Sequence, residues 1–116
     1  MGISELLQWQ WNGYPKYHQS KANLLIHIIT VPIFITCTAA MTVMLFKLNW
    51  LGALITAILA KIAFAVQGIG HKREPNTSVP FSNPANAALR MFFEQWLTFP
   101  RFVLSGGWLR AYKSAV

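Results

Sequence analysis

Residues 24–46 read LLIHIITVPIFITCTAAMTVMLF and contain no charged side chain over 23 positions. A helix of this length extends about 34 Å, which is enough to cross a hydrocarbon layer of roughly 30 Å. Starting at Asn23, the stretch predicts a membrane helix over residues 23–46. Pro32 lies inside it, and a proline is tolerated in lipid where neighbouring groups satisfy the freed carbonyl.

A second apolar stretch covers residues 50–70, with Lys61 as its single charge. Only residues 47–49 separate the two stretches, so the connection is a tight turn and the helices are predicted to be antiparallel neighbours. The chain has 116 residues, 54% of them hydrophobic and only 11% charged, which is too little polar surface for a soluble protein of this size. We therefore predict one all-α integral membrane domain, residues 1–116, built on a transmembrane hairpin.

The remaining segments are shorter and more polar. Residues 1–22 are predicted to form an interfacial N-terminal segment, and residues 71–83 a polar loop. Residues 84–99 carry apolar side chains on one side and predict an amphipathic helix, while residues 101–112 predict a C-terminal apolar helix. These last two form either interfacial or re-entrant helices or a broken third membrane span, and the first reading is favoured.

Charge indicates how the hairpin is oriented. The net charge is +7, but the cations are scattered singly and match no nucleic-acid-binding motif, so contact with anionic lipid headgroups is the simpler interpretation. The cations near the outer helix ends are Lys16, Lys21, Lys72, Arg73 and Arg90, against Lys47 alone at the turn. The positive-inside rule then places the outer ends in the cytoplasm. Lys61 is given no catalytic role.

The three histidines of the chain all lie near this one end of the hairpin. His18 precedes the first span, His27 lies about one turn inside it, and His71 closes the second span. Neutral imidazole is the commonest metal ligand among side chains, and ionisable groups beside membrane spans are costly and rarely incidental. A shared metal site is therefore the sharpest hypothesis, and interfacial hydrogen bonding is the alternative.

Polar residues nearby fit the same hypothesis. Glu74 follows His71 by three residues, so it becomes a fourth ligand if the helix continues by a turn; its alternative role is to neutralise Lys72 or Arg73. Histidines with one carboxylate are the ligand chemistry of non-haem Fe(II) oxygenases. Three further polar residues are candidates for orienting the imidazoles, or for joining the helices without a metal: Tyr17, Asn23 and Gln67.

Two ordered motifs also resemble a known family. The chain carries Y-H-x4-N-x3-H-x4-P from Tyr17 to Pro32 and Q-x2-G-H-x2-E from Gln67 to Glu74. This pattern resembles the 2-hydroxy-fatty-acid (2-hydroxypalmitate) dioxygenases, small membrane proteins of fatty-acid α-oxidation. The resemblance implies an Fe(II)-dependent, O2-consuming enzyme that shortens a 2-hydroxy fatty acid by one carbon. It also implies that the iron ligands are His18, His27 and His71.

Two other functions remain open from the sequence. One is a non-catalytic accessory subunit of a larger membrane complex, in which the histidines only pack against a partner. The other is a metal-dependent enzyme on the same scaffold that acts on a different lipid. A homo-oligomer is a further expectation, because small residues are available for close helix contact at Gly52, Ala53, Ala57 and Ala60.

Overall fold

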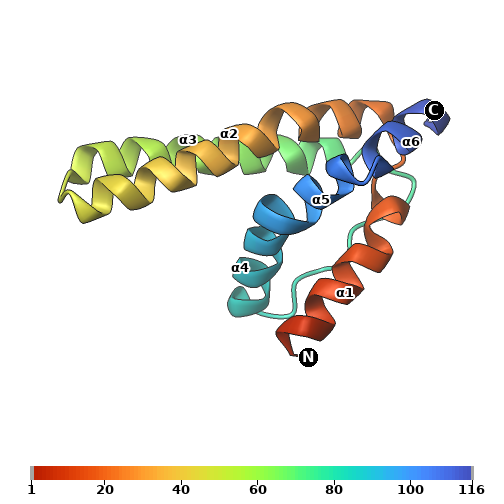
Figure 1. Cartoon of the computed structure of the whole chain (residues 1–116), viewed down its shortest axis with the longest axis horizontal. Coiled ribbons are helices and arrows are strands. Elements are labelled where there is room, and N and C mark those ends of the chain that lie inside the picture. The colour runs from red at the N-terminus through yellow and green to blue at the C-terminus, as the bar shows by residue number, and fades with distance from the viewer. Residues whose placement is uncertain (1, 116) are drawn as a thin grey trace.

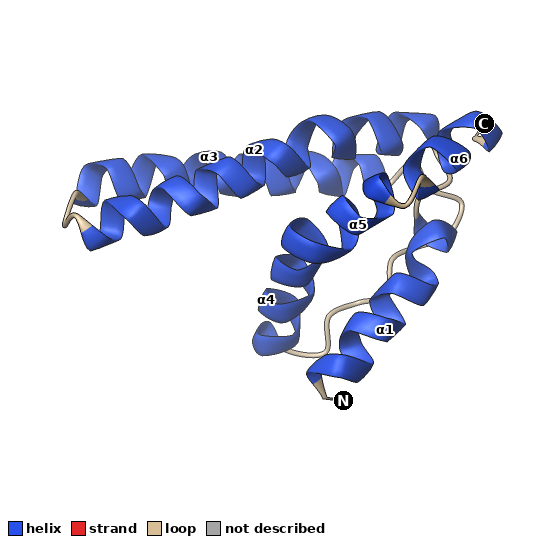
Figure 2. Ribbon diagram, viewed as in Figure 1, coloured by secondary structure: helices blue, strands red, loops and turns tan. Residues whose placement is uncertain are grey.

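The computed structural model describes residues 2–115, and within that range every regular element is a helix (Figure 2). A hairpin runs along the long axis of the molecule. It consists of α2 (Lys21–Phe46) and α3 (Trp50–His71), which lie side by side and antiparallel (Figure 1). The all-helical prediction is confirmed. Helix α2 begins two residues before the predicted Asn23, and α3 extends one residue beyond the predicted residue 70.

Side chains cap both helices of the hairpin at their starts. The Ser20 hydroxyl accepts a hydrogen bond from the Asn23 backbone N–H at 3.3 Å, which opens α2. In the turn, Leu48 adopts a left-handed conformation with φ of 56°, and the Asn49 side chain accepts from the Gly52 N–H at 2.9 Å. The short connection therefore returns the chain directly along α2, and the outer ends of both helices meet.

Small side chains bring the two helices of the hairpin together. Ala60 and Ala63 of α3 pack on Phe34 of α2, and Ala53 is buried as well. Near the outer end, a Cβ on Gly70 would overlap the Asn23 side-chain oxygen. Two of the small residues predicted to be available to another copy, Ala53 and Ala60, are thus already buried within the chain.

The other elements gather at the outer end of the hairpin (Figure 1). Helix α1 (Ile3–Gly13) leads into the 3-10 turn η1 (Tyr14–Tyr17), which precedes the hairpin. After the hairpin and a loop, the chain forms α4 (Pro84–Phe93), which contacts α1. The chain then continues through a π-helical turn η2 (Glu94–Thr98), α5 (Phe99–Leu104) and α6 (Gly107–Ser114).

This C-terminal course differs from the two predicted helices. The helix is not interrupted at Pro100, which lacks a backbone N–H. It widens into the π-turn η2 just before this residue and continues as α5. The break comes at Gly106, whose φ of 81° ends the helical run. The predicted helix over residues 101–112 is therefore divided between α5 and α6.

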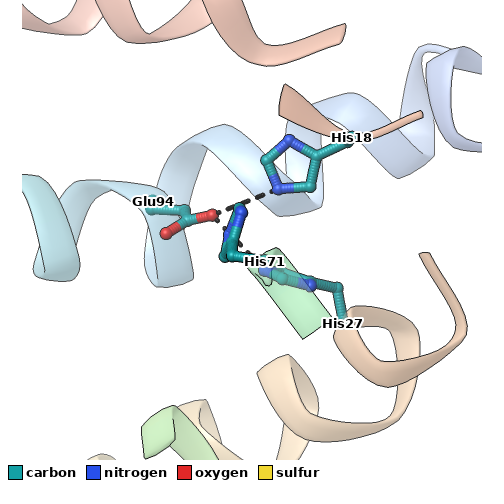
Figure 3. A group of neighbouring side chains, drawn as sticks. All are labelled: His18, His27, His71 and Glu94. Atoms are coloured by element: carbon teal, nitrogen blue, oxygen red, sulfur yellow. Dashed lines mark ion pairs between the residues drawn. The ribbon is translucent and has the colours of Figure 1, made fainter. Parts of the chain in front are cut away.

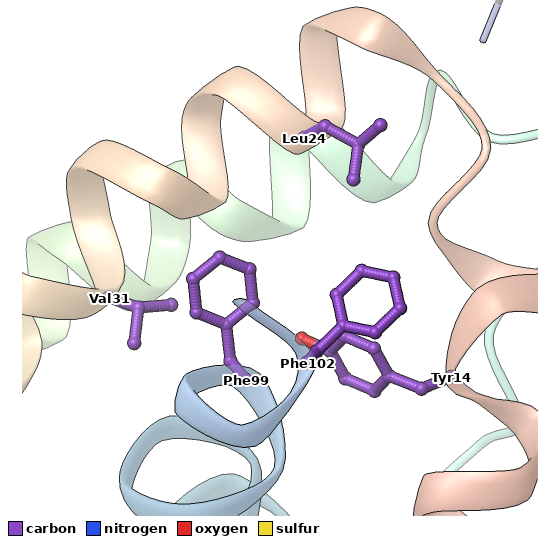
Figure 4. Close-up of a cluster of buried hydrophobic side chains, with 5 residues drawn as sticks. All are labelled: Tyr14, Leu24, Val31, Phe99 and Phe102. Carbon is purple, nitrogen blue, oxygen red and sulfur yellow. The ribbon is translucent and has the colours of Figure 1, made fainter. Parts of the chain in front are cut away.

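A compact apolar core lies where η1, α2 and α5 meet (Figure 4). The Tyr14 ring packs edge-on against Phe102, with centroids 5.0 Å apart, and Phe99 lies between Tyr14 and α2. Leu24 and Val31 of α2 complete the cluster. This core fixes the N-terminal and C-terminal segments on one end of the hairpin.

We predict that Gly70→Ala destabilises the fold relative to Gly68→Ala. Both substitutions gain the same helix propensity, but a Cβ at Gly68 meets open space, whereas one at Gly70 meets Asn23. Overpacking of this kind costs about 1–3 kcal/mol. Thermal unfolding of the two variants in detergent measures the difference, and equal melting temperatures would refute the tight contact.

Candidate metal centre

The structure brings the three histidines together, as the hairpin predicts (Figure 3). His27 comes from α2, His71 is the last residue of α3, and His18 directly follows η1. The three ring centroids form a near-equilateral triangle with sides of 4.9, 4.9 and 5.0 Å. His18 and His27 are 2% and 0% exposed, so two of the three rings are fully removed from solvent.

Glu94, the first residue of η2, supplies a carboxylate to this group. Its Oε2 lies 3.6 Å from Nε2 of His18 and 3.6 Å from Nε2 of His27 (Figure 3). One potential ligand atom from each of the four residues falls within 4.8 Å of the others. Three nitrogens and one oxygen, from four separate segments, therefore surround one point.

Backbone carbonyls fix the protonation of two of the rings. His18 Nδ1 lies 2.8 Å from the Tyr14 carbonyl oxygen, and His27 Nδ1 lies 3.0 Å from that of Asn23. A carbonyl oxygen only accepts hydrogen bonds, so each Nδ1 carries the proton and donates it. In the neutral ring, Nε2 is then left as a lone pair directed at Glu94.

These residues fit a metal ion. Nε2 of His18 and of His27 are buried and have no hydrogen-bond partner. A ring-nitrogen lone pair and the ionised Glu94 carboxylate repel each other unless a proton or a metal ion lies between them. Ligand atoms at 2.0–2.2 Å from one ion are about 3–4 Å apart. The two 3.6 Å separations fall in that range, and all four potential ligand atoms lie within 4.8 Å of one another.

Tyr14 also holds the carboxylate. Its hydroxyl donates to Glu94 Oε2 at 2.9 Å, and its ring stacks on His18 with centroids 3.8 Å apart. Burial, the Glu94 charge and this hydrogen bond raise the pKa of Tyr14, so the phenol keeps its proton. Burial opposes ionisation of Glu94, but hydrogen bonds and positive charge from the His18 and His27 rings outweigh it and lower the pKa of that carboxyl.

Glu74, the predicted carboxylate ligand, lies elsewhere. Its two oxygens accept hydrogen bonds from the backbone of Gln19 and Ser20 and from the Asn23 amide, at 2.7, 3.0 and 2.8 Å. The three-residue spacing from His71 does not bring it into the cluster, because α3 ends at His71. Glu74 instead ties the segment after α3 to the start of α2.

The predicted orienting residues act differently from expectation. Asn23 does hold His27, but through its backbone carbonyl, while its side chain binds Glu74. Gln67 forms a reciprocal pair with Gln95, with hydrogen bonds of 2.9 and 2.7 Å, and so joins α3 to η2 next to Glu94. Tyr17 contributes its backbone carbonyl to the Asn23 amide at 3.4 Å.

Sequence reasoning missed Glu94 as a ligand because it falls four residues after Arg90 and therefore resembles half of a surface ion pair. The structure directs the Arg90 guanidinium to the carbonyls of Val79 and Pro80 instead. The chain contains only three acidic residues, and this small number is a signal that could have pointed to Glu94 as a candidate ligand.

A cleft of about 600 Å³ leads to the cluster between α1, α4 and the loop that precedes α4. His18, His71 and Glu94 lie on its wall. Apolar and aromatic side chains also line it, among them Trp9, Phe64, Phe81 and Met91, together with the two cations Lys16 and Arg90. A volume of this size is ordinary for a small-molecule site.

We predict that Glu94→Gln and Glu74→Gln have different effects, because Glu94 belongs to the metal-ligand cluster and Glu74 does not. Glu94→Gln removes the charged donor from the cluster and lowers the affinity for Zn²⁺ by at least about 100-fold, since even loss of a residue behind a ligand costs 10–100-fold. Glu74→Gln retains wild-type affinity and lowers the melting temperature. Isothermal titration of the purified full chain measures both; equal losses of affinity would contradict the assignment.

Comparison with protein families agrees with the motifs. The model of a family described as 2-hydroxy-palmitic acid dioxygenase Mpo1-like matches residues 5–103. No curated protein and no solved structure matches the chain. The matched range contains both sequence motifs, all three histidines and Glu94. It covers most of the 116 residues, and the chain therefore belongs to the Mpo1-like family.

Proposed function

We propose that this protein is an Fe(II)-dependent dioxygenase of the membrane that shortens 2-hydroxy fatty acids by one carbon. The observation that carries the proposal is the convergence of His18, His27, His71 and Glu94 at the wall of an apolar cleft. The description of the family supports this class of reaction. The cluster and the cleft support a place for it in this chain.

The donor set suits iron. Imidazole nitrogens with a carboxylate oxygen and no thiolate are typical of non-haem Fe(II) oxygenases, which keep positions open for O2 and substrate. Bound here, iron would supply adjacent positions for O2 and for the 2-hydroxycarboxylate, and a route for electrons between them. His18 and His27 would bind through Nε2, with their tautomers already set by the protein.

The overall reaction balances without another reductant. A 2-hydroxy acid, R–CH(OH)–COOH, and one O2 give R–COOH, CO2 and H2O. The bond between C1 and C2 breaks, C2 is oxidised to the new carboxyl carbon, C1 leaves as CO2, and O2 takes up four electrons. The substrate itself provides all of these electrons.

The cleft fits the two ends of such a substrate. Its cations, Lys16 and Arg90, make the approach to the site attractive to an anion. Its aromatic and apolar wall suits an acyl chain, and Tyr14 keeps Glu94 in place while the carboxylate head binds nearby. Such a substrate would account for a cleft that combines a cluster of polar ligands with two cations and an apolar wall.

The hairpin supports a membrane location. Both α2 and α3 are long and apolar enough to cross a membrane by length and composition. Among the helices described for residues 2–115, none besides α2 and α3 lies over the end of the hairpin that carries the turn (Figure 1). Large apolar side chains are exposed at that end at Val43, Phe46, Leu51, Leu54 and Ile55. We place the metal end on the cytoplasmic side, where the cations gather.

The activity test uses the purified full chain loaded with Fe(II) in detergent, with 2-hydroxypalmitate and O2. We expect a C15 acid in a 1:1 ratio to the O2 consumed, and no turnover of palmitate or 3-hydroxypalmitate, which lack the adjacent hydroxyl. His27→Ala removes a ligand and lowers the rate by at least about 100-fold.

A protein that binds iron but leaves every 2-hydroxy acid unchanged would contradict the substrate assignment. It would point to another lipid substrate. A protein that binds no transition metal would favour the accessory subunit.

A further inference from the structure

Residues 78–81 form a loop, the cleft loop, that connects two parts of the site. All four of its residues line the cleft. At its beginning, the Ser78 hydroxyl lies 3.3 Å from His71 Nδ1. The same loop that forms the wall of the cleft therefore reaches one of the metal-ligand candidates.

Arg90 of α4 fastens the middle of the cleft loop. Its two terminal nitrogens donate to the carbonyl oxygens of Val79 at 2.8 Å and of Pro80 at 3.1 Å. A guanidinium presents these donors in a rigid planar fork, which a lysine ammonium cannot reproduce. The loop is thus held through its backbone at two successive residues.

Two aromatic rings hold the guanidinium itself. The Arg90 Cζ lies 5.0 Å from the ring centroid of Trp9 and 4.5 Å from that of Phe81. Trp9 belongs to α1 and Phe81 to the cleft loop, so one side chain of α4 joins three segments. Cation–π contacts of this kind add to the hydrogen bonds and restrict the side chain to one position.

His71 needs such support more than its neighbours do. The Nδ1 atoms of His18 and His27 are held by carbonyls four residues earlier in the chain, within or next to a helix. His71 is only partly buried, stands at the last position of α3, and has the Ser78 hydroxyl as its Nδ1 partner. Its ring orientation therefore depends on where the cleft loop lies.

We propose that Arg90 is a positioning residue of the metal centre, which acts through the cleft loop and Ser78 to hold His71 in line with the other ligands. The inference rests on the proposed metal site. It assigns a role to a residue about one helical turn before Glu94, and it predicts that the cleft wall and the metal site are ordered together.

The test measures Co²⁺ binding to the purified full chain, by affinity and by the visible absorption of the bound ion. Arg90→Lys keeps the charge but loses the fork, and Ser78→Ala removes one hydroxyl from an exposed loop. We expect each to weaken Co²⁺ binding by about 10–100-fold and to change the absorption spectrum. The double variant should bind no more weakly than the weaker single variant, because both changes act on the same ring.

Arg101→Lys is the matched control, since Arg101 also stacks on a tryptophan, with Cζ 3.9 Å from the Trp11 ring centroid, but does not line the cleft. It should bind Co²⁺ as the wild type does. In a His71→Ala background, Arg90→Lys should have no further effect.

Wild-type affinity and spectrum in both Arg90→Lys and Ser78→Ala would overturn the inference while leaving the metal site intact. If Arg90→Lys fails to fold, Ser78→Ala alone decides: unchanged binding overturns the inference. Absence of Co²⁺ binding in the wild type would instead overturn the proposed function itself.

Discussion

The site depends on an electrostatic constraint: a carboxylate and two imidazole nitrogens face one another where water is largely excluded. Nε2 of His18 and His27 are buried without hydrogen-bond partners, and Glu94 lies 3.6 Å from each. Without a positive charge between them these groups repel, and the protein pays for their burial. Protons on the two rings or one bound divalent cation would remove the repulsion, and the cluster of three histidines and Glu94 could hold such a cation.

Fold and site share the same residues. Tyr14 belongs to the apolar core, yet it also stacks on His18 and donates to Glu94. Phe99 packs in that core and lies 5.8 Å from the His27 ring. The reciprocal amide pair of Gln67 and Gln95 satisfies two buried polar groups and fixes the π-turn that carries Glu94. Loss of packing at this end of the hairpin should therefore disturb the ligands directly.

The hairpin and its histidines could be predicted because they depend on local sequence. An uncharged stretch of helical length, a three-residue turn and histidines near the outer ends bring His27 and His71 together. Glu94 could not be found this way, because tertiary packing and the π-turn before Pro100 direct its side chain. The three-residue spacing from His71 predicts Glu74 as a ligand only if the helix continues. Because α3 ends at His71, the two side chains do not share a helix face. Iron, substrate and membrane orientation remain predictions.

The most direct test of the central claim is the X-ray absorption fine structure of the full chain loaded with Fe(II). Coordination by His18, His27, His71 and Glu94 predicts a first shell of nitrogen and oxygen atoms, with the multiple-scattering signal of three imidazole rings and no sulfur. A shell with one imidazole or none would contradict the convergence of His18, His27 and His71 on a single ion.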